Sequence, residues 1–200
     1  MKVLVVFYST YGHIHKMAEA VAEGAKTLAG TEVELRRVPE TLPPDVLEKM
    51  GAVEAQKVFS HVRVCSVEEL AQADAVIFGT PTRFGNMDAA LKYYLDGTVN
   101  EWLTAAAVGK PAGVFTSTSS LHGGQESTLL SMALPLIHHG MLFVGIPWTE
   151  EAMSTTTTGG TPYGASHVSW SRKNDELSDD EKQLARALGA RVADIAKKLS

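Results

Sequence analysis

The residues best suited to chemistry near the start of the chain lie in a loop between an expected strand and an expected helix. The apolar segment KVLVVFY at 2–8 precedes the loop, and a helical pattern follows it. The loop consists of Ser9, Thr10, Tyr11, Gly12, His13 and Ile14. A helix N-terminus presents unpaired N–H groups and the positive end of the helix dipole, so it binds anions. The loop therefore predicts a phosphate site, although Ser9 and Thr10 could equally serve only as helix caps.

The kind of phosphate is narrowed by motifs that this sequence lacks. It contains neither G-x-G-x-x-G, which binds a pyrophosphate, nor the G-x-x-x-x-G-K-[ST] loop of ATP- and GTP-binding proteins. The first loop also carries no Lys or Arg, so neutral donors would hold the anion, with His13 able to add a proton. A terminal monophosphate fits this loop better than a nucleoside triphosphate.

Two further polar loops follow later strands, with the sequences TPTRFGNM at 80–87 and STSSLHGGQE at 117–126. The first offers a planar cation and an aromatic face, and the second offers hydroxyl groups and glycines for backbone contact with a ring edge. Three such loops at successive strand ends fit one ligand with a phosphate tail and a flat polar head, which describes flavin mononucleotide (FMN). The candidate FMN-binding residues in these two loops are Thr82, Arg83, Phe84, Gly85, Ser117, Thr118, Ser119, Ser120, Leu121 and His122.

Strands and helices alternate along the chain. Apolar or alternating runs predict strands at 2–8, 31–38, 75–79, 111–116 and 142–146. Helical patterns are expected at 14–28, 44–50, 87–95, 101–108 and 128–139, the last interrupted or restarting at Pro135. Capping-box sequences that begin at Ser66 and Ser178 predict a short helix and a final helix that ends near residue 198.

This alternation predicts a single α/β domain, residues 1–200, with a parallel sheet covered on both faces. Ligands bind such sheets beyond the carboxyl ends of the strands, where the strand order reverses. The long segment 147–177 is rich in Thr, Ser and Gly, and we expect it to be functional or interfacial.

Composition excludes several classes of partner. The formal net charge is −5 and no basic cluster is present, which argues against nucleic acid. Cys65 is the only cysteine, so no internal disulfide is possible. We expect a cytoplasmic protein with no integral membrane segment, because no signal peptide or apolar stretch of about 20 residues is evident. The histidine spacing predicts no metal site.

Several longer motifs match a known family across nearly the whole chain. They are YSTYGHI at 8–14, RVPET at 37–41, FGTPTRFGNM at 78–87, LDG-x₄-W at 95–102, GGQE at 123–126, HHGM at 138–141 and GGTPYGA at 159–165. With these motifs the chain resembles the WrbA-type NAD(P)H:quinone oxidoreductases, which are flavodoxin-like FMN proteins. PTRFGNM, HHGM and GGTPYG are the most specific of the matches.

The resemblance implies a flavodoxin-like three-layer sandwich whose five-stranded parallel sheet has the order 2-1-3-4-5. It implies that FMN binds non-covalently at the carboxyl edge of the sheet and carries electrons from NADH or NADPH to a quinone. By the same resemblance Tyr11 is linked to the nicotinamide substrate, Trp102 lines the quinone pocket, and His138 approaches the flavin. Homotetramers with pockets shared between subunits are also implied.

Some roles stay open at this point. His138 could donate a hydrogen bond or a proton to a quinone oxygen, or it could only bind flavin or pack at the edge of the site. Arg83 could hold its loop or face the flavin, and Trp102 could be ordinary packing. Leu121 and His122 stand where many family members have glycines, which leaves the shape of the quinone pocket open.

Other classes of protein compete with the enzyme. The main alternative is a flavodoxin-type electron carrier or a flavin-binding scaffold without nicotinamide-dependent turnover. A phospho-receiver domain is disfavoured because the first and third strands do not end in acidic residues. A serine hydrolase is disfavoured because the sequence lacks the G-x-S-x-G elbow.

Overall fold

A parallel sheet forms the middle layer of the protein, of which the computed structural model describes residues 1–170 and 176–200. The strands are β1 (Lys2–Phe7), β2 (Glu32–Arg37), β3 (Ala75–Arg83), β4 (Asn86–Met87), β5 (Pro111–Thr118), β6 (Leu142–Phe143) and β7 (Ala165–Val168). The helices are α1 (His13–Lys26), α2 (Pro44–Lys49), α3 (Val53–Lys57), α4 (Glu69–Gln72), α5 (Ala89–Asp96), α6 (Val99–Leu103), α7 (Gln125–His138), α8 (Ala152–Thr155) and α9 (Asp179–Leu199).

The strand order confirms the predicted topology. The main path of the sheet runs β2-β1-β3-β5-β6, with parallel neighbours throughout. These are the five predicted strands in the order 2-1-3-4-5. The order reverses at β1, because β2 lies on one side of it and β3 on the other. A ligand site is therefore expected beyond the carboxyl ends of β1 and β3.

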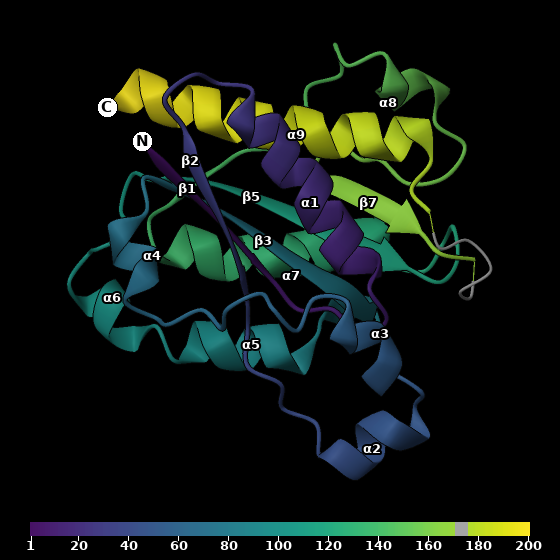
Figure 1. Ribbon diagram of the computed structural model, residues 1–200. Coiled ribbons are helices and arrows are strands. Elements are labelled where there is room, and N and C mark those ends of the chain that lie inside the picture. Colours follow the sequence, from purple (N-terminus) through teal and green to yellow (C-terminus); the bar gives the residue numbers. More distant parts are fainter. Residues whose placement is uncertain (171–175) are drawn as a thin grey trace.

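The sheet is buried on both faces because alternate residues of β1 point to opposite sides. Val3, Val5 and Phe7 pack into the core beneath α1 and α9. Leu4 and Val6 pack into the second core beneath α5 and α7. Figure 1 shows α1 and α9 packed together, and it shows α2 standing out from the body of the domain, away from α9.

The single fifth strand predicted at 142–146 is wrong in its extent. Only Leu142 and Phe143 form β6, which pairs with the first two residues of β5. Along the rest of the same edge of β5, from Phe115 to Thr118, the neighbouring strand is β7. The chain leaves the sheet at Gly145, where an added Cβ would lie 2.1 Å from the carbonyl oxygen of Pro162. Two of the seven described strands, β4 and β7, were therefore not predicted.

Three helix predictions also need correction. The helix expected at 101–108 begins earlier and ends earlier, as α6 at Val99–Leu103. Helix α7 continues through Pro135 without a break, and the N–H of His139 donates to the Pro135 carbonyl at 3.0 Å. The capping box predicted at Ser66 forms only in part. The Glu69 carboxylate accepts from the N–H of Ser66 at 2.9 Å, but helix α4 begins with Glu68 as a cap that makes no side-chain hydrogen bond.

Helices α1 and α9 approach closely because each has a glycine at their contact. A Cβ on Gly24 would lie 1.9 Å from the carbonyl oxygen of Arg186, and one on Gly189 would lie 1.9 Å from that of Val21. This packing fixes α1, and with it the loop at its N-terminus, against the last helix of the chain.

The N-terminus of α9 carries the capping box predicted at Ser178. The N–H of Glu181 donates to Ser178 Oγ at 3.2 Å, and the N–H of Ser178 donates to Glu181 Oε2 at 2.9 Å. The buried Glu181 carboxylate also accepts from the N–H groups of Gly159 and Val168, at 3.0 and 2.9 Å, and lies 2.8 Å from His167 Nδ1. Burial alone would raise the pKa of Glu181, but His167 and the N–H donors outweigh it and lower that pKa to about 2.

Among residues 1–170 and 176–200, no helix combines the length and the apolar character that are needed to cross a bilayer.

Replacing Glu181 with Gln tests this carboxylate. Because its pKa is lower in the folded state than in the unfolded chain, ionised Glu181 stabilises the fold above about pH 4.5, and this stabilisation is lost as the pH falls towards about 2. We expect Glu181→Gln to lower the free energy of unfolding at pH 7 by on the order of 2–3 kcal/mol. The difference from wild type should shrink as the pH falls through that window, as measured by urea unfolding.

The matched control is Asp179→Asn, which removes an exposed carboxylate from the same helical turn. It should change the free energy of unfolding by less than about 1 kcal/mol. Equal effects of the two substitutions would show that the buried contacts of Glu181 contribute nothing specific.

Candidate functional site

A cavity of about 380 Å³ opens at the carboxyl ends of β1, β3 and β5. This volume lies in the range typical of small-molecule sites, and its place is the point where the strand order reverses. The lining residues are Ser9, Thr10, Tyr11, His13, Ile14, Pro81, Thr82, Arg83, Ser117, Thr118, Ser119 and Ser169. The three loops that the sequence singled out therefore meet around one space.

The first loop turns into α1 at Gly12, whose φ of +92° is one that L side chains rarely adopt. No described atom lies within 4 Å of the position that a Cβ would take there, so the backbone conformation alone requires glycine. The N–H of Gly12 donates to Ser9 Oγ at 3.1 Å. Ser9 thus stabilises the turn, while the N-terminus of α1 lies against the cavity and suits an anion.

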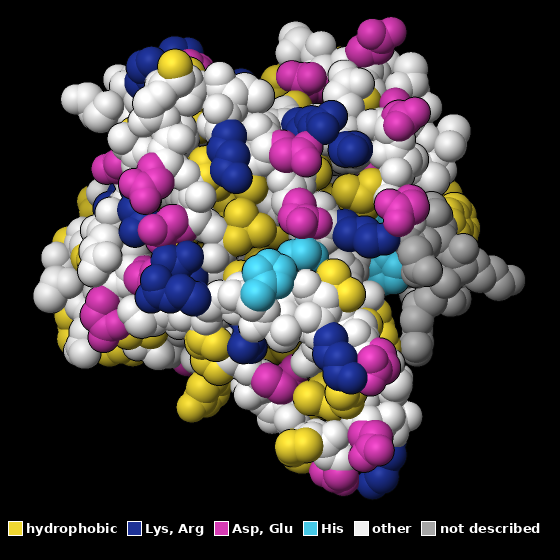
Figure 2. All heavy atoms as spheres, in the orientation of Figure 1, with side chains coloured by type: hydrophobic (Ala, Val, Ile, Leu, Met, Phe, Trp, Pro, Cys, Tyr) yellow, Lys and Arg dark blue, Asp and Glu magenta, His cyan; other side chains and the backbone are white. Residues whose placement is uncertain are grey.

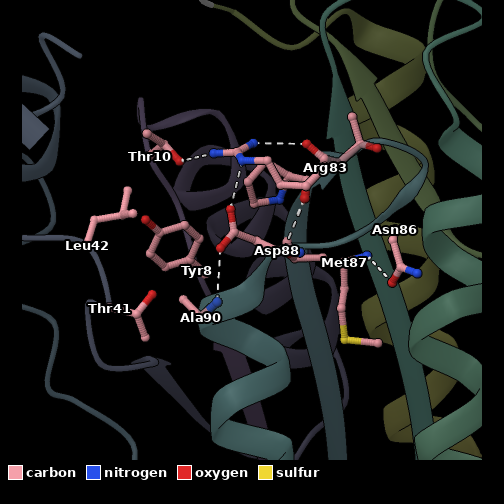
Figure 3. A network of polar contacts seen from close by, with 12 residues as sticks. Tyr8, Thr10, Thr41, Leu42, Arg83, Asn86, Met87, Asp88 and Ala90 are labelled. Carbon is pink, nitrogen blue, oxygen red and sulfur yellow. Dashed lines mark hydrogen bonds and ion pairs between the residues drawn. The ribbon is translucent and has the colours of Figure 1, made fainter. Parts of the chain in front are cut away.

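Arg83 joins the first loop to the end of β3. Figure 3 shows its guanidinium between Thr10 and Asp88: Nη2 donates to Thr10 Oγ1 at 2.8 Å, and Nε lies 3.0 Å from Asp88 Oδ2. Asp88 in turn caps α5 by accepting from the N–H of Ala90 at 3.0 Å. Burial raises the pKa of Asp88, against the lowering effects of the Ala90 N–H and the Arg83 charge. Arg83 therefore holds its loop and also lines the cavity.

A second polar cluster, which the sequence did not single out, supports the loop from the other side. The Tyr8 hydroxyl donates to the Glu40 carboxylate at 3.1 Å, and Gln56 Nε2 donates to it at 2.9 Å. Burial and the charge of Glu40 raise the pKa of Tyr8. The Tyr11 hydroxyl donates to the Met50 carbonyl at 3.2 Å. The segment between β2 and β3 therefore packs against the first loop.

The turn between β3 and β4 is strained at Phe84. Its φ is +55°, and Gly85 follows at +78°. The Phe84 side chain is fully exposed and lines a neighbouring groove with Leu42 and Met50 rather than the cavity itself. Backbone strain of this kind persists where the surrounding structure fixes it, often at ligand sites.

The third loop lines the cavity with Ser117, Thr118 and Ser119. Ser120, Leu121 and His122 continue beyond the described lining, and the hydroxyl of Thr118 donates to the Ser120 carbonyl at 2.8 Å. Ser169 also lines the cavity, although no sequence pattern predicts it, and its N–H donates to the Thr118 carbonyl at 2.9 Å. Ser169 reaches the cavity because β7 lies beside β5, which only the pairing of those strands could have revealed.

No sequence pattern predicts the place of His167 or the buried contacts of Glu181. His167 is fully buried on β7, and its Nε2 lies 3.2 Å from Nδ1 of His13. The two rings stack with their centroids 5.2 Å apart. Through these contacts the capping carboxylate of α9 is linked to a residue that lines the cavity.

His138 and Trp102 lie together but away from this cavity. The indole Nε1 of Trp102 donates to the His138 carbonyl at 2.9 Å. His138 ends α7 just before β6, which pairs with the start of β5, whereas the cavity lies at the end of β5. Six residue-to-residue steps along the strand separate Pro111 from Ser117, which is roughly 20 Å. Within one chain, the structure does not bring these two residues to the other predicted site residues.

The cavity fits the ligand expected from the sequence. A helix N-terminus, a glycine turn and three hydroxyl side chains meet at its first loop, which suits a phosphate. The ends of β3 and β5 present Arg83, a proline and serine-rich backbone, which suits the edge of a polar ring. The donors of the first loop are neutral N–H and hydroxyl groups, which can hold a single phosphate group at a helix N-terminus, and FMN fits all of these features.

Comparison with known proteins agrees with this geometry. The family model described as NADPH-dependent FMN reductase matches residues 1–151. A Geotalea daltonii protein named NAD(P)H dehydrogenase (quinone) is 55% identical, with 100% of this chain and 98% of that protein covered. A protein of the same name from Geobacter sulfurreducens is 54% identical, with 100% of both chains covered.

Solved structures agree as well. The crystal structure of a flavodoxin, WrbA-like protein from Agrobacterium tumefaciens has a TM-score of 0.67 and 29% identity, covering 100% of this chain and 99% of that one. Oxidised Flavodoxin 1 from Bacillus cereus has a TM-score of 0.62 at 16% identity, covering 97% and 98%, and shows the shared fold.

Replacing Gly12 with Ala tests the first loop. The added methyl group meets no steric obstacle but opposes the left-handed turn, so we expect FMN to bind at least about tenfold more weakly. The measurement is the quenching of flavin fluorescence during titration of the apoprotein with FMN.

Gly109→Ala is the matched control, since Gly109 has a φ of +77° and also has no described atom within 4 Å of a Cβ. It lies before β5, at the opposite end of that strand from the cavity. Both substitutions should cost about 1 kcal/mol of folding free energy, but only Gly12→Ala should weaken FMN binding. Equal FMN affinity in the two variants would contradict the assignment of the loop.

Proposed function

Because the chain belongs to the NADPH-dependent FMN reductase family, we propose that it is an FMN-dependent NAD(P)H:quinone oxidoreductase. The observation that carries this proposal is the cavity, where a phosphate-binding helix N-terminus and two polar loops meet at the carboxyl edge of a flavodoxin-like sheet. Full-length relatives more than 50% identical and named NAD(P)H dehydrogenase (quinone) support the reaction.

When bound, FMN supplies two-electron chemistry, accepting a hydride from a nicotinamide and delivering electrons to a quinone. The protein positions the reactants and tunes the electrostatics. The N-terminus of α1 and the hydroxyls of Ser9 and Thr10 bind the phosphate, and Arg83 fixes Thr10 beside it. The ends of β3 and β5, at Thr82 and Ser117, place the ring.

Substrates would approach from the open side of the cavity. Tyr11 lines both the cavity and a neighbouring groove that contains His15 and His61, so it is placed to contact a nicotinamide that enters between them. The resemblance assigns Trp102 to the quinone pocket, and His138 would hold a proton or hydrogen bond for a quinone oxygen. Neither reaches the cavity of its own chain.

A second copy of the chain would supply them. Helices α6 and α7 expose a set of apolar side chains, which are Val99, Trp102, Leu103, Leu130, Leu134 and Ile137. Exposed apolar side chains on two adjoining helices are typical of protein interfaces. We propose that this α6–α7 patch packs in a homotetramer and carries Trp102 and His138 to the cavity of another copy.

A cytoplasmic location is consistent with the one free, buried cysteine.

The reaction can be followed in a single anaerobic cuvette. Addition of NADH or NADPH to the FMN-loaded protein should bleach the flavin absorbance, and benzoquinone should restore it, with ping-pong steady-state kinetics. Bound flavin that neither nicotinamide bleaches would instead identify an electron carrier or a scaffold.

Mixing two impaired variants tests whether pockets are shared, provided that the assay uses an FMN concentration that loads wild type but leaves Gly12→Ala largely unloaded. Gly12→Ala damages the phosphate loop, and Trp102→Ala removes the proposed quinone contact while leaving the FMN loop of its own chain intact. If each pocket combines two copies, co-expressed mixed oligomers contain some complete pockets and should regain a substantial part of wild-type quinone turnover.

The matching control mixes Gly12→Ala with a Gly12→Ala and Trp102→Ala double variant, which contains no complete FMN loop and should stay inactive. Sedimentation measures the oligomeric state of each mixture. Mixed oligomers that show no recovery would place Trp102 outside the pocket of a neighbouring copy.

A further inference from the structure

Two of the sequence motifs, distant from each other in the chain, meet at one place in the fold. The segment LDGTVNEW at 95–102 leads from the end of α5 into α6, and HHGM at 138–141 ends α7. The indole Nε1 of Trp102 donates to the His138 carbonyl at 2.9 Å. A second contact joins the same two segments, because Nε2 of His139 lies 2.8 Å from Oγ1 of Thr98, and both of these side chains are buried.

These contacts close into a ring around Trp102. The N–H of Trp102 donates to the Thr98 carbonyl at 3.1 Å, in the first turn of α6, and His138 and His139 are neighbours in the chain. Trp102 is therefore held twice, through its backbone by Thr98 and through its indole by His138. Its side chain is 53% exposed, so packing within the chain covers only about half of it. The ring of hydrogen bonds gives this exposed indole a fixed direction.

The single hydroxyl proton of Thr98 decides how Thr98 and His139 share their contact. Thr98 donates this proton to the Leu95 carbonyl at 2.7 Å, and a carbonyl only accepts. If the hydroxyl turned to His139 instead, two oxygens would lie this close with no proton between them. Nε2 of His139 must therefore donate to Thr98. Nδ1 of His139 is buried and has no hydrogen-bond partner among the described residues, so Thr98 alone orients the imidazole.

His139 makes this contact as a neutral side chain. Burial lowers its pKa below the ordinary value, against the opposing effect of the Glu101 charge. The charged residues of α5 do not change this, since Lys92 and Asp96 are exposed and pair with each other. A neutral imidazole carries one proton, and Thr98 requires that proton on Nε2. The contact is thus a defined hydrogen bond between two uncharged side chains.

Resting on the proposed role of Trp102 in the quinone pocket, we propose that His139 and Thr98 are positioning residues for the quinone half of the reaction. Their hydrogen bond fixes the end of α7 to the start of α6, and so keeps the His138 carbonyl within reach of the indole of Trp102. Neither residue lines the cavity. Loss of their contact should therefore weaken quinone binding without affecting FMN binding or the reduction of the flavin.

Two pairs of substitutions separate the hydrogen bond from simple packing. Thr98→Val keeps the shape of the side chain but removes the hydroxyl, which Thr98→Ser retains. His139→Asn leaves the Leu95 contact of Thr98 intact but ends short of the hydroxyl, whereas His139→Gln carries an amide N–H at about the reach of Nε2. The matched control is Thr104→Val, which removes a hydroxyl from the other end of α6 that donates to the Asn100 carbonyl at 2.9 Å.

The experiment has a spectroscopic and a kinetic readout on the full-length, FMN-loaded protein. The first is the indole N–H resonance of Trp102 in heteronuclear NMR, assigned by its loss in Trp102→Phe. The second is the KM for benzoquinone at saturating NADH. We expect Thr98→Val and His139→Asn to shift the resonance and to raise this KM about three- to tenfold, the effect of one hydrogen bond. FMN affinity and the rate at which NADH bleaches the flavin should not change.

The conservative variants Thr98→Ser and His139→Gln, and the control Thr104→Val, should resemble wild type in both readouts. If a buried substitution at one position prevents folding, the pair at the other position carries the test. An indole resonance that stays unchanged in Thr98→Val and His139→Asn would overturn the inference. Equal effects within each pair would also overturn it, because they would indicate packing alone.

Trp102→Ala separates this inference from the proposed function. If Trp102→Ala raises the KM for benzoquinone but Thr98→Val and His139→Asn do not, the positioning role is wrong and the quinone contact of Trp102 stands. If Trp102→Ala itself leaves that KM unchanged, the proposed quinone contact fails, whatever the indole resonance shows.

Discussion

The Glu181 carboxylate is the interaction on which the cavity end of this fold depends. This carboxylate is fully buried and accepts three backbone hydrogen bonds. The donors are the N–H groups of Ser178 at the start of α9, Gly159 in the turn before β7 and Val168 at the end of β7. A buried carboxylate is stable only with such partners. Because it holds β7 against α9, it places β7 beside β5, and this strand pairing brings Ser169 and His167 towards the cavity.

The cavity itself depends on backbone conformations that few residues can adopt. Gly12 and Gly124, at the starts of α1 and α7, have φ values of +92° and +91°, and Phe84 has a φ of +55°. Arg83 ties the first loop to the start of α5 through Thr10 and Asp88, which restricts these turns (Figure 3). The surface beside the cavity also carries several imidazole and charged side chains over α1 and the neighbouring loops (Figure 2). The protein thus presents a pre-formed cavity whose first loop, residues 9–14, carries no Lys or Arg.

Local patterns were enough to predict most of the sheet and the loops of the site. The apolar runs of β1, β3 and β5, and the polar residues directly after each of them, predict where the cavity lies. The sequence did not predict that two short strands, β6 and β7, share the edge of β5. Strand β7 is only four residues long, contains the polar Ser166 and His167, and is stabilised by partners distant in sequence. The same long-range pairing is why Ser169 was not predicted, and why Glu181 was predicted only as part of the capping box and not as a partner of β7. Motif resemblance named Trp102 and His138, but no pattern in one chain could show that they lie at the other end of α7 from the cavity.

A crystal structure of the protein with FMN tests the central claim most directly, namely that the cavity of one copy is an FMN site completed by another. We expect the phosphate to lie at residues 9–14, the ring to lie between Thr82 and Ser117, and Trp102 of the partner subunit to face the ring. A phosphate bound elsewhere would contradict the FMN site. A ring covered only by residues of its own chain would contradict the shared pocket.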